Sequence, residues 1–171
     1  MQDVKSIYSN PLKYTGADIW TFFRDFAERD CIKKSYSENG DDGNVFYRCE
    51  NKMIILTDGY LNFDPTIQSK RIAQKSCMQV EKLRNDNNWE SNFTKYEMDP
   101  IPNKDFKNLD VLMLEINPYE PQLNPTEFPI IEKYWKTWFS DMKVKISNIH
   151  QVEESIPLIN SSVSAFLKDN N

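Results

Sequence analysis

The stretch that most constrains the fold runs from Asn124 to Met142, with the sequence NPTEFPIIEKYWKTWFSDM. When the residues are placed about 100° apart, as in a helix, the aromatic and aliphatic side chains gather on one side. A wide apolar face of this kind is typical of a helix that packs on a core. Asn124 suits the N-cap position and Pro125 the first helical position. The apolar face consists of Phe128, Ile131, Tyr134, Trp135, Trp138, Phe139 and Met142.

Two interpretations of this aromatic face follow. It is either the centre of the hydrophobic core or a surface that binds a partner. Two Trp, one Tyr and two Phe on one helix bring a large hydrophobic area. We therefore favour the core interpretation and expect the rest of the fold to pack on this helix.

The first half of the chain predicts a helix followed by strands. Residues 16–34 have an amphipathic pattern that predicts a helix. Short apolar runs at 45–49, 53–57 and 60–63 predict three strands, because turn residues separate them. Asp58-Gly59 is a strong hairpin-turn signal, so we predict that the three strands form an antiparallel meander.

The second half alternates between helices and strands. Helices are predicted over residues 64–83 and 124–142, and a last one from Ser155. Strands are predicted over 89–98, 109–116 and 144–149, and the apolar 109–116 segment should be central in its sheet. The predicted fold class is therefore α+β. We expect a single domain over residues 1–171 in two layers, with an antiparallel or mixed sheet of about five to six strands and about four helices.

Composition restricts the possible functions. The chain has 171 residues and a net charge of −5, which argues against general nucleic-acid binding because that needs a basic surface. Its four glycines nearly exclude glycine-rich phosphate loops. No apolar run approaches the ~18 residues of a membrane span, and the first residues lack the apolar centre of a signal peptide. We expect a cytoplasmic protein without a membrane partner.

The cysteine pattern also favours a cytoplasmic location. Cys31, Cys49 and Cys77 do not form a disulfide framework, and none lies in a Cys-x-x-Cys pair. We expect reduced thiols, as in a cytoplasm. A Cys31–Cys49 bond is the alternative for a protein exported by another route.

The sequence lacks the parts of most catalytic systems. A single histidine, His150, excludes sites built from several histidines. There is no Gly-x-Ser-x-Gly, Walker or dinucleotide-binding motif. Asp110 and Glu115 are the acids within a strongly apolar segment, and we expect both at its rim. No cofactor and no metal site are predicted.

A loop of turn residues, 37–44, contains no hydrophobic side chain. Its carboxylates lack the ligand spacing of an EF-hand, so we interpret them as a solvated surface. Under the meander prediction, the Asp58-Gly59 turn lies at the same end as this loop. Together they would form a negative patch that steers a basic partner. The predicted partner-binding residues are Glu38, Asp41, Asp42 and Asp58.

These features favour a non-catalytic protein-binding module. Within that class we expect an acidic inhibitor or immunity-type protein that neutralises a basic toxin or enzyme domain. One alternative is a small enzyme whose carboxylates, tyrosines or His150 converge only in three dimensions. Another is an accessory subunit of a larger assembly, for which an exposed apolar patch would be the sign.

Overall fold

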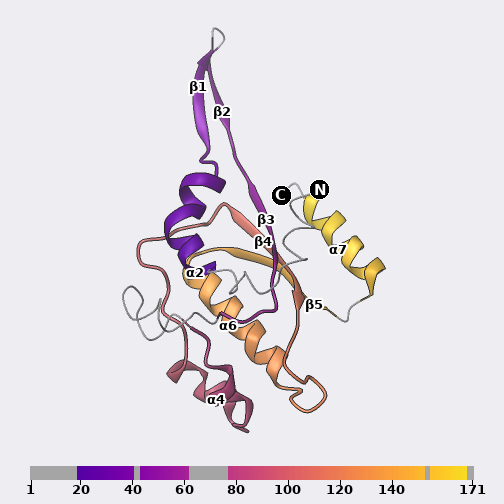
Figure 1. Cartoon of the computed structure of the whole chain (residues 1–171). Helices are drawn as coiled ribbons and strands as arrows, with labels where there is room; N and C mark the ends of the chain where they lie inside the picture. The colour runs from indigo at the N-terminus through magenta and orange to yellow at the C-terminus, as the bar shows by residue number, and fades with distance from the viewer. Residues whose placement is uncertain (1–18, 41–42, 62–76, 153–154, 169–171) are drawn as a thin grey trace, which may run out of the picture.

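The computed structural model describes residues 19–40, 43–61, 77–152 and 155–168 (Figure 1). Within these residues five strands form two separate sheets, and helices pack against the larger one. The predicted α+β class is confirmed. No helix in the described part of the chain is long and apolar enough to cross a membrane.

The larger sheet has three parallel strands in the order β3-β4-β5. Their bounds are Asn51–Leu56, Leu109–Ile116 and Lys145–Gln151. β4 is the central strand, as its apolar sequence predicts, and six of its eight residues are buried. A strand buried on both faces must be apolar at successive positions rather than at alternate ones.

Helix α6, Glu127–Asp141, connects β4 to β5 and packs on one face of the sheet (Figure 1). Its aromatic face is buried, with Trp135 and Trp138 at 0% and 1% exposure. The core interpretation is therefore confirmed, and the partner-binding interpretation of this face is wrong. The helix begins three residues after the predicted N-cap, and the Asn124 carbonyl accepts a turn hydrogen bond from Glu127 N–H just before it.

Two further helical segments extend the core. Helix α2, Ile19–Thr21, continues into the π-helix η2, Phe22–Cys31. Phe23 from η2 packs edge-to-face on Trp138 and Phe139, at centroid distances of 5.6 and 5.2 Å. The wider π winding, in which Ile32 N–H donates to Ala27 carbonyl five residues back, rotates Phe26 out of the predicted apolar face.

Helix α7, Ile156–Lys168, covers the opposite face of β4. Its Phe166 packs with Leu112 and Leu114 of β4 in a second apolar cluster. Lys52 of β3 donates through Nζ to the Phe166 carbonyl at 2.6 Å. The sheet thus carries helices on both faces, one layer more than the two-layer prediction.

The predicted antiparallel meander is wrong. β1, Tyr36–Gly40, and β2, Gly43–Tyr47, form a two-stranded hairpin of their own, and β3 pairs in parallel with β4. Asp58-Gly59 is no hairpin turn. Gly59 has φ +100°, and a Cβ there would lie 2.9 Å from Ile116 and 3.0 Å from Ile131. The glycine is needed because the chain leaving β3 passes directly against β4 and α6.

The predicted strand at 89–98 is also wrong. This segment forms helix α5, Trp89–Asn92, and the 3-10 helix η3, Phe93–Lys95. Trp89 and Phe93 are four residues apart, which is a helical as well as a strand-like spacing. The predicted helix at 64–83 falls largely outside the described residues, and its end appears as α4, Val80–Arg84.

Candidate functional site

The β1–β2 hairpin extends away from the sheet and its helices (Figure 1). All ten of its strand residues are exposed, including several large apolar side chains that would be buried in a core. Phe46 is the most exposed, at 68%. The hairpin therefore adds surface rather than core, and its exposed apolar residues are Tyr36, Val45, Phe46 and Tyr47.

The register of the hairpin sorts these side chains onto two faces. Tyr36 pairs with Tyr47 and Glu38 with Val45, and because side chains alternate along a strand these four share one face. Phe46 lies on the other face, opposite Ser37. The two tyrosine rings stack with centroids 4.8 Å apart and planes at 18°. Stacked phenol rings beside a carboxylate suit contact with arginine or lysine side chains of a protein partner.

The structure separates the predicted partner-binding residues. Glu38 lies midway along the hairpin and is exposed, whereas Asp41 and Asp42 lie outside the described residues. Asp58 is exposed beyond the far end of β3, and six strand residues span roughly 20 Å. Its carboxylate accepts a hydrogen bond from Tyr60 N–H at 3.1 Å, which shapes the local turn. The structure therefore does not bring Asp58 to Glu38.

A second feature lies where β3 and β4 end, a site that the sequence patterns missed. Glu127, in the first turn of α6, is fully buried. Arg84 Nε lies 2.6 Å from Glu127 Oε2, and Arg84 Nη2 donates to Oε1 at 2.7 Å. Tyr60 donates its hydroxyl hydrogen to the same Oε1, and Tyr119 N–H donates to the Tyr60 hydroxyl at 2.9 Å. No motif signals this cluster, since its members come from four separate segments.

The carboxyl ends of parallel strands are where α/β folds usually bind ligands, so this cluster is the natural place to look for an active site. Its carboxylate is, however, already engaged: Oε1 accepts hydrogen bonds from Arg84 Nη2 and the Tyr60 hydroxyl, and Oε2 is in ion-pair contact with Arg84 Nε. The hydrogen bond to Glu127 raises the pKa of Arg84 above its usual value. The arrangement favours a clamp that joins α4, α6 and the segment after β3, rather than a general acid or base.

Asp110, Glu115, Cys31 and Cys49 lie apart from this cluster in the described structure. Asp110 pairs with Lys145 at 3.2 Å, and Glu115 is exposed where β4 becomes irregular, with φ 67°. Both rim placements are as predicted. Cys31 and Cys49 carry free thiols and are not bonded to each other. Among the described residues no group of three or more His, Cys, Asp or Glu is placed to hold a metal ion.

Two tyrosines, the buried Tyr134 and the partly buried Tyr60, give the fold a pH dependence. Desolvation, reinforced at Tyr60 by the hydrogen bond to Glu127, raises the pKa of both Tyr60 and Tyr134 to about 12. The folded state therefore holds these protons more tightly than the unfolded chain, whose tyrosines titrate near 10. The two protonated tyrosines therefore contribute their full share of the free energy of unfolding below about pH 10. This contribution is lost as the pH rises towards about 12.

We expect the free energy of unfolding, measured with denaturant between pH 9 and pH 12, to fall most steeply above pH 10. Tyr134 is 1% exposed, and its contribution should be on the order of 2 kcal/mol. In the Tyr60→Phe and Tyr134→Phe variants, the free energy of unfolding should fall less steeply with pH over this range. Tyr47→Phe, in the exposed hairpin, is the control. If the free energy of unfolding of all three variants depends on pH as in the wild type, Tyr60 and Tyr134 do not cause the loss of stability at high pH.

No protein-family model, curated protein or solved structure matches this chain.

Proposed function

We propose that this chain is a non-catalytic protein-binding module that contacts its partner through the β1–β2 hairpin. The observation that carries the proposal is the exposure of all ten hairpin strand residues, three of them aromatic, on an element that projects from the body. Exposed apolar side chains gathered in one place are typical of interaction sites. Tyrosine is also among the residues that supply most binding energy at interfaces.

The charge of the chain indicates the kind of partner. A net charge of −5 would speed association with a basic protein and slow it with an acidic one. Glu38 places one carboxylate beside the tyrosine pair, and Asp41 and Asp42 follow in the sequence between β1 and β2. Within this class we favour an inhibitor or immunity-type protein that neutralises a basic toxin or enzyme domain, in a cytoplasmic setting.

A capture experiment tests the hairpin. Tagged wild-type chain, expressed together with the products of neighbouring genes, is compared with the Phe46→Ser/Tyr47→Ser variant. The substituted side chains are 68% and 41% exposed, so the fold should remain intact. Loss of two interface aromatics is expected to weaken binding at least tenfold, because residues of this kind contribute about 1.4 kcal/mol or more.

The matched control is Leu123→Ser, which removes a side chain that is 75% exposed but lies outside the hairpin. It should bind like the wild type. For a purified partner, Glu38→Gln/Asp41→Asn/Asp42→Asn should slow association at low salt and flatten its dependence on ionic strength, since rim charges act mainly on the association rate. A partner that binds the Phe46→Ser/Tyr47→Ser variant as tightly as the wild type would place the contact surface elsewhere.

The alternative of a small enzyme has one observation in its favour, the partly buried contact between Tyr60 and Glu127 at the carboxyl end of the sheet. An enzyme that used this pair would lose its activity in Tyr60→Phe, whereas the binding module would retain its partner in that variant.

A further inference from the structure

A small polar pocket lies at the amino ends of the three strands of the larger sheet, at the opposite end from the cluster around Glu127. Its volume is about 140 Å³, which is room for about four or five water molecules or for one compact anion. The residues that line it belong to the described part of the chain. Those with a charge are Arg48, Glu50, Lys52, Lys107, Asp110 and Lys145.

This pocket is positive although the whole chain is acidic. Four cations line it together with two carboxylates, whereas the chain has a net charge of −5. The two carboxylates hold their cations loosely, since Arg48 Nη2 lies 3.3 Å from Glu50 Oε1 and Lys145 Nζ lies 3.2 Å from Asp110 Oδ2. Other ion pairs between described residues measure 2.5–3.0 Å. The pocket therefore has an excess of positive charge that its own acids do not neutralise.

The turn that leads into β4 adds donors without a protein partner. Leu109 N–H donates to the Phe106 carbonyl at 2.8 Å, so Lys107 and Asn108 occupy the two central positions of a tight turn. Within the described residues, neither the Lys107 ammonium nor the Asn108 side-chain amide has a hydrogen-bond or ion-pair partner. Both residues are exposed at the pocket, so their donors are available to a ligand from solvent.

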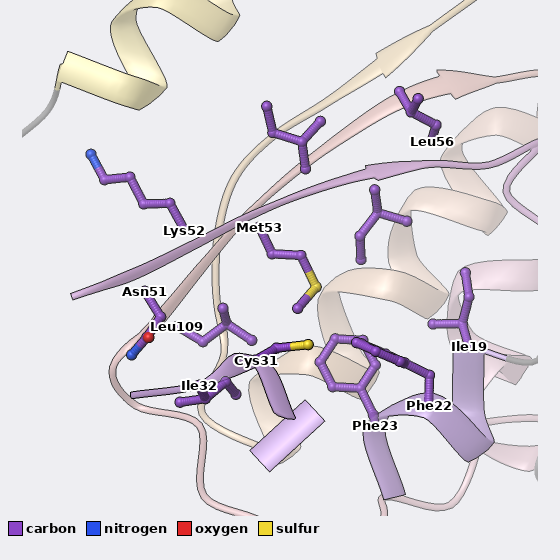
Figure 2. A pocket seen from close by; sticks show the side chains of 12 residues that line it. Ile19, Phe22, Phe23, Cys31, Ile32, Asn51, Lys52, Met53, Leu56 and Leu109 are labelled. Atoms are coloured by element: carbon purple, nitrogen blue, oxygen red, sulfur yellow. The ribbon is translucent and has the colours of Figure 1, made fainter. Parts of the chain in front are cut away.

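The floor of the pocket is held by β3. The Asn108 carbonyl accepts hydrogen bonds from Asn51 N–H at 2.9 Å and from Asn51 Nδ2 at 3.2 Å, which join the turn to the start of β3. Lys52 Nζ donates to the Phe166 carbonyl of α7 at 2.6 Å. Figure 2 shows its side chain pointing away from Met53 and from the apolar groove that Met53 lines. Lys52 therefore adds its charge to the pocket from a fixed position, and the other three cations have exposed side chains.

We propose that this pocket binds a phosphate group, either as inorganic phosphate or as a monoester whose remainder extends into solvent. Arg48, Lys107 and Lys145 supply the charged donors, and the Asn108 amide supplies a neutral one. Charge-assisted hydrogen bonds from lysine and arginine are typical of phosphate recognition. A phosphate monoester brings about two negative charges at pH 7, which matches the excess of two cations. A carboxylate brings one and leaves the second cation unmatched.

The first test is a titration of the full-length protein with sodium phosphate at constant ionic strength, followed by backbone amide chemical shifts in NMR spectra. The amides of the pocket residues should shift and saturate. Arg48→Gln/Lys107→Gln should weaken the binding of phosphate by about tenfold or more, because hydrogen bonds between charged groups are strong. Both side chains are exposed, so the fold should remain intact.

The matched control is Lys34→Gln/Lys136→Gln, which removes two cations outside the pocket whose side chains are 77% and 57% exposed. This variant has the same net charge as Arg48→Gln/Lys107→Gln and should bind phosphate like the wild type. Equal weakening in both variants would show that phosphate responds to the charge of the whole chain rather than to this pocket, and would overturn the proposal.

A second pair of variants tests the competition between the ligand and the acids of the pocket. Glu50→Gln removes a carboxylate that pairs with Arg48, so phosphate should bind about two- to fivefold more tightly, the range expected for an exposed ion pair. Glu132→Gln makes the same change of charge in α6, where Glu132 pairs with Lys136. It should leave the affinity for phosphate unchanged.

Phenyl phosphate distinguishes the two sources of the group. If the natural ligand is the free anion, inorganic phosphate should bind more tightly than phenyl phosphate. If it is a monoester, phenyl phosphate should bind at least as tightly, because its ring lies outside the pocket. Both results support a phosphate site, provided that Arg48→Gln/Lys107→Gln weakens the binding.

Two further results would contradict the proposal. One is a set of chemical shifts that increases linearly, without saturation, into the tens of millimolar of phosphate. The other is an affinity that Arg48→Gln/Lys107→Gln leaves unchanged. The Phe46→Ser/Tyr47→Ser variant should bind phosphate like the wild type, so failure of this site and failure of the proposed partner-binding function remain distinguishable.

Discussion

Trp135→Ala is expected to lower the free energy of unfolding by about 3–5 kcal/mol. The indole is fully buried and stacks on Phe139, with ring centroids 5.3 Å apart. Its Nε1 donates a hydrogen bond of 2.8 Å to the Gly59 carbonyl. Truncation would therefore leave a large cavity under the sheet and an unpaired buried carbonyl where the chain leaves β3. Chemical denaturation followed by circular dichroism measures the loss.

A pair of smaller substitutions separates packing from hydrogen bonding. Trp138 is equally buried, but its indole N–H has no hydrogen-bond partner in the described structure. Trp135→Phe removes a satisfied hydrogen bond and leaves the Gly59 carbonyl without its donor. Trp138→Phe removes an unsatisfied N–H. Trp135→Phe should therefore cost more, by about 1 kcal/mol. Equal losses, or a Trp135→Ala loss below about 1 kcal/mol, would contradict this account of the core.

Arg84→Met should have a comparable effect, about 3–5 kcal/mol, by a different mechanism. Arg84 is the cation paired with Glu127, which is 0% exposed. Removing the guanidinium would leave that buried carboxylate with the Tyr60 hydroxyl as its remaining partner in the cluster. A buried charge without its counter-ion is among the costliest defects in a protein interior.

The double variant Arg84→Met/Glu127→Met tests the mechanism. It removes both charges together and should recover most of the stability lost in the single variant, because apolar replacements of buried ion pairs are often near neutral. The exposed pair Arg48–Glu50, 3.3 Å apart, is the control, and Arg48→Met should cost less than about 1 kcal/mol. If the double variant is as unstable as Arg84→Met alone, the loss comes from packing rather than from an unpaired charge.

The candidate binding surface was only partly predictable from the sequence. The absence of apolar residues predicts that the segment containing Glu38 is exposed, and Glu38 is exposed. The exposure of the aromatic residues on both sides of it is not predicted. Tyr36, Phe46 and Tyr47 resemble ordinary strand residues, and composition alone does not distinguish an apolar strand in a core from one that projects into solvent. Asp58 was assigned to the same surface through a meander that does not form.

The carboxyl-end cluster was beyond prediction for a related reason. Tyr60, Arg84 and Glu127 are far apart in the sequence, and each alone has the pattern of a surface residue. Their convergence depends on the parallel pairing of β3 with β4 and on the connection through α6. Parallel pairing joins distant segments without a turn signal between them, so no local sequence pattern predicts it.

The sequence by itself determined the elements whose periodicity is strong and long. These are the aromatic helix α6, the buried strand β4, the strand β5 and the final helix α7. Repeated apolar spacing specifies which face a helix or strand must bury, whatever it packs against. Tertiary structure alone decided how the short strands pair, because isolated runs of five or six residues fit several partners. The same Asp58-Gly59 that suits a hairpin turn instead lets the chain pass 2.9 Å from Ile116, and that close approach exists only once β4 and α6 are in place.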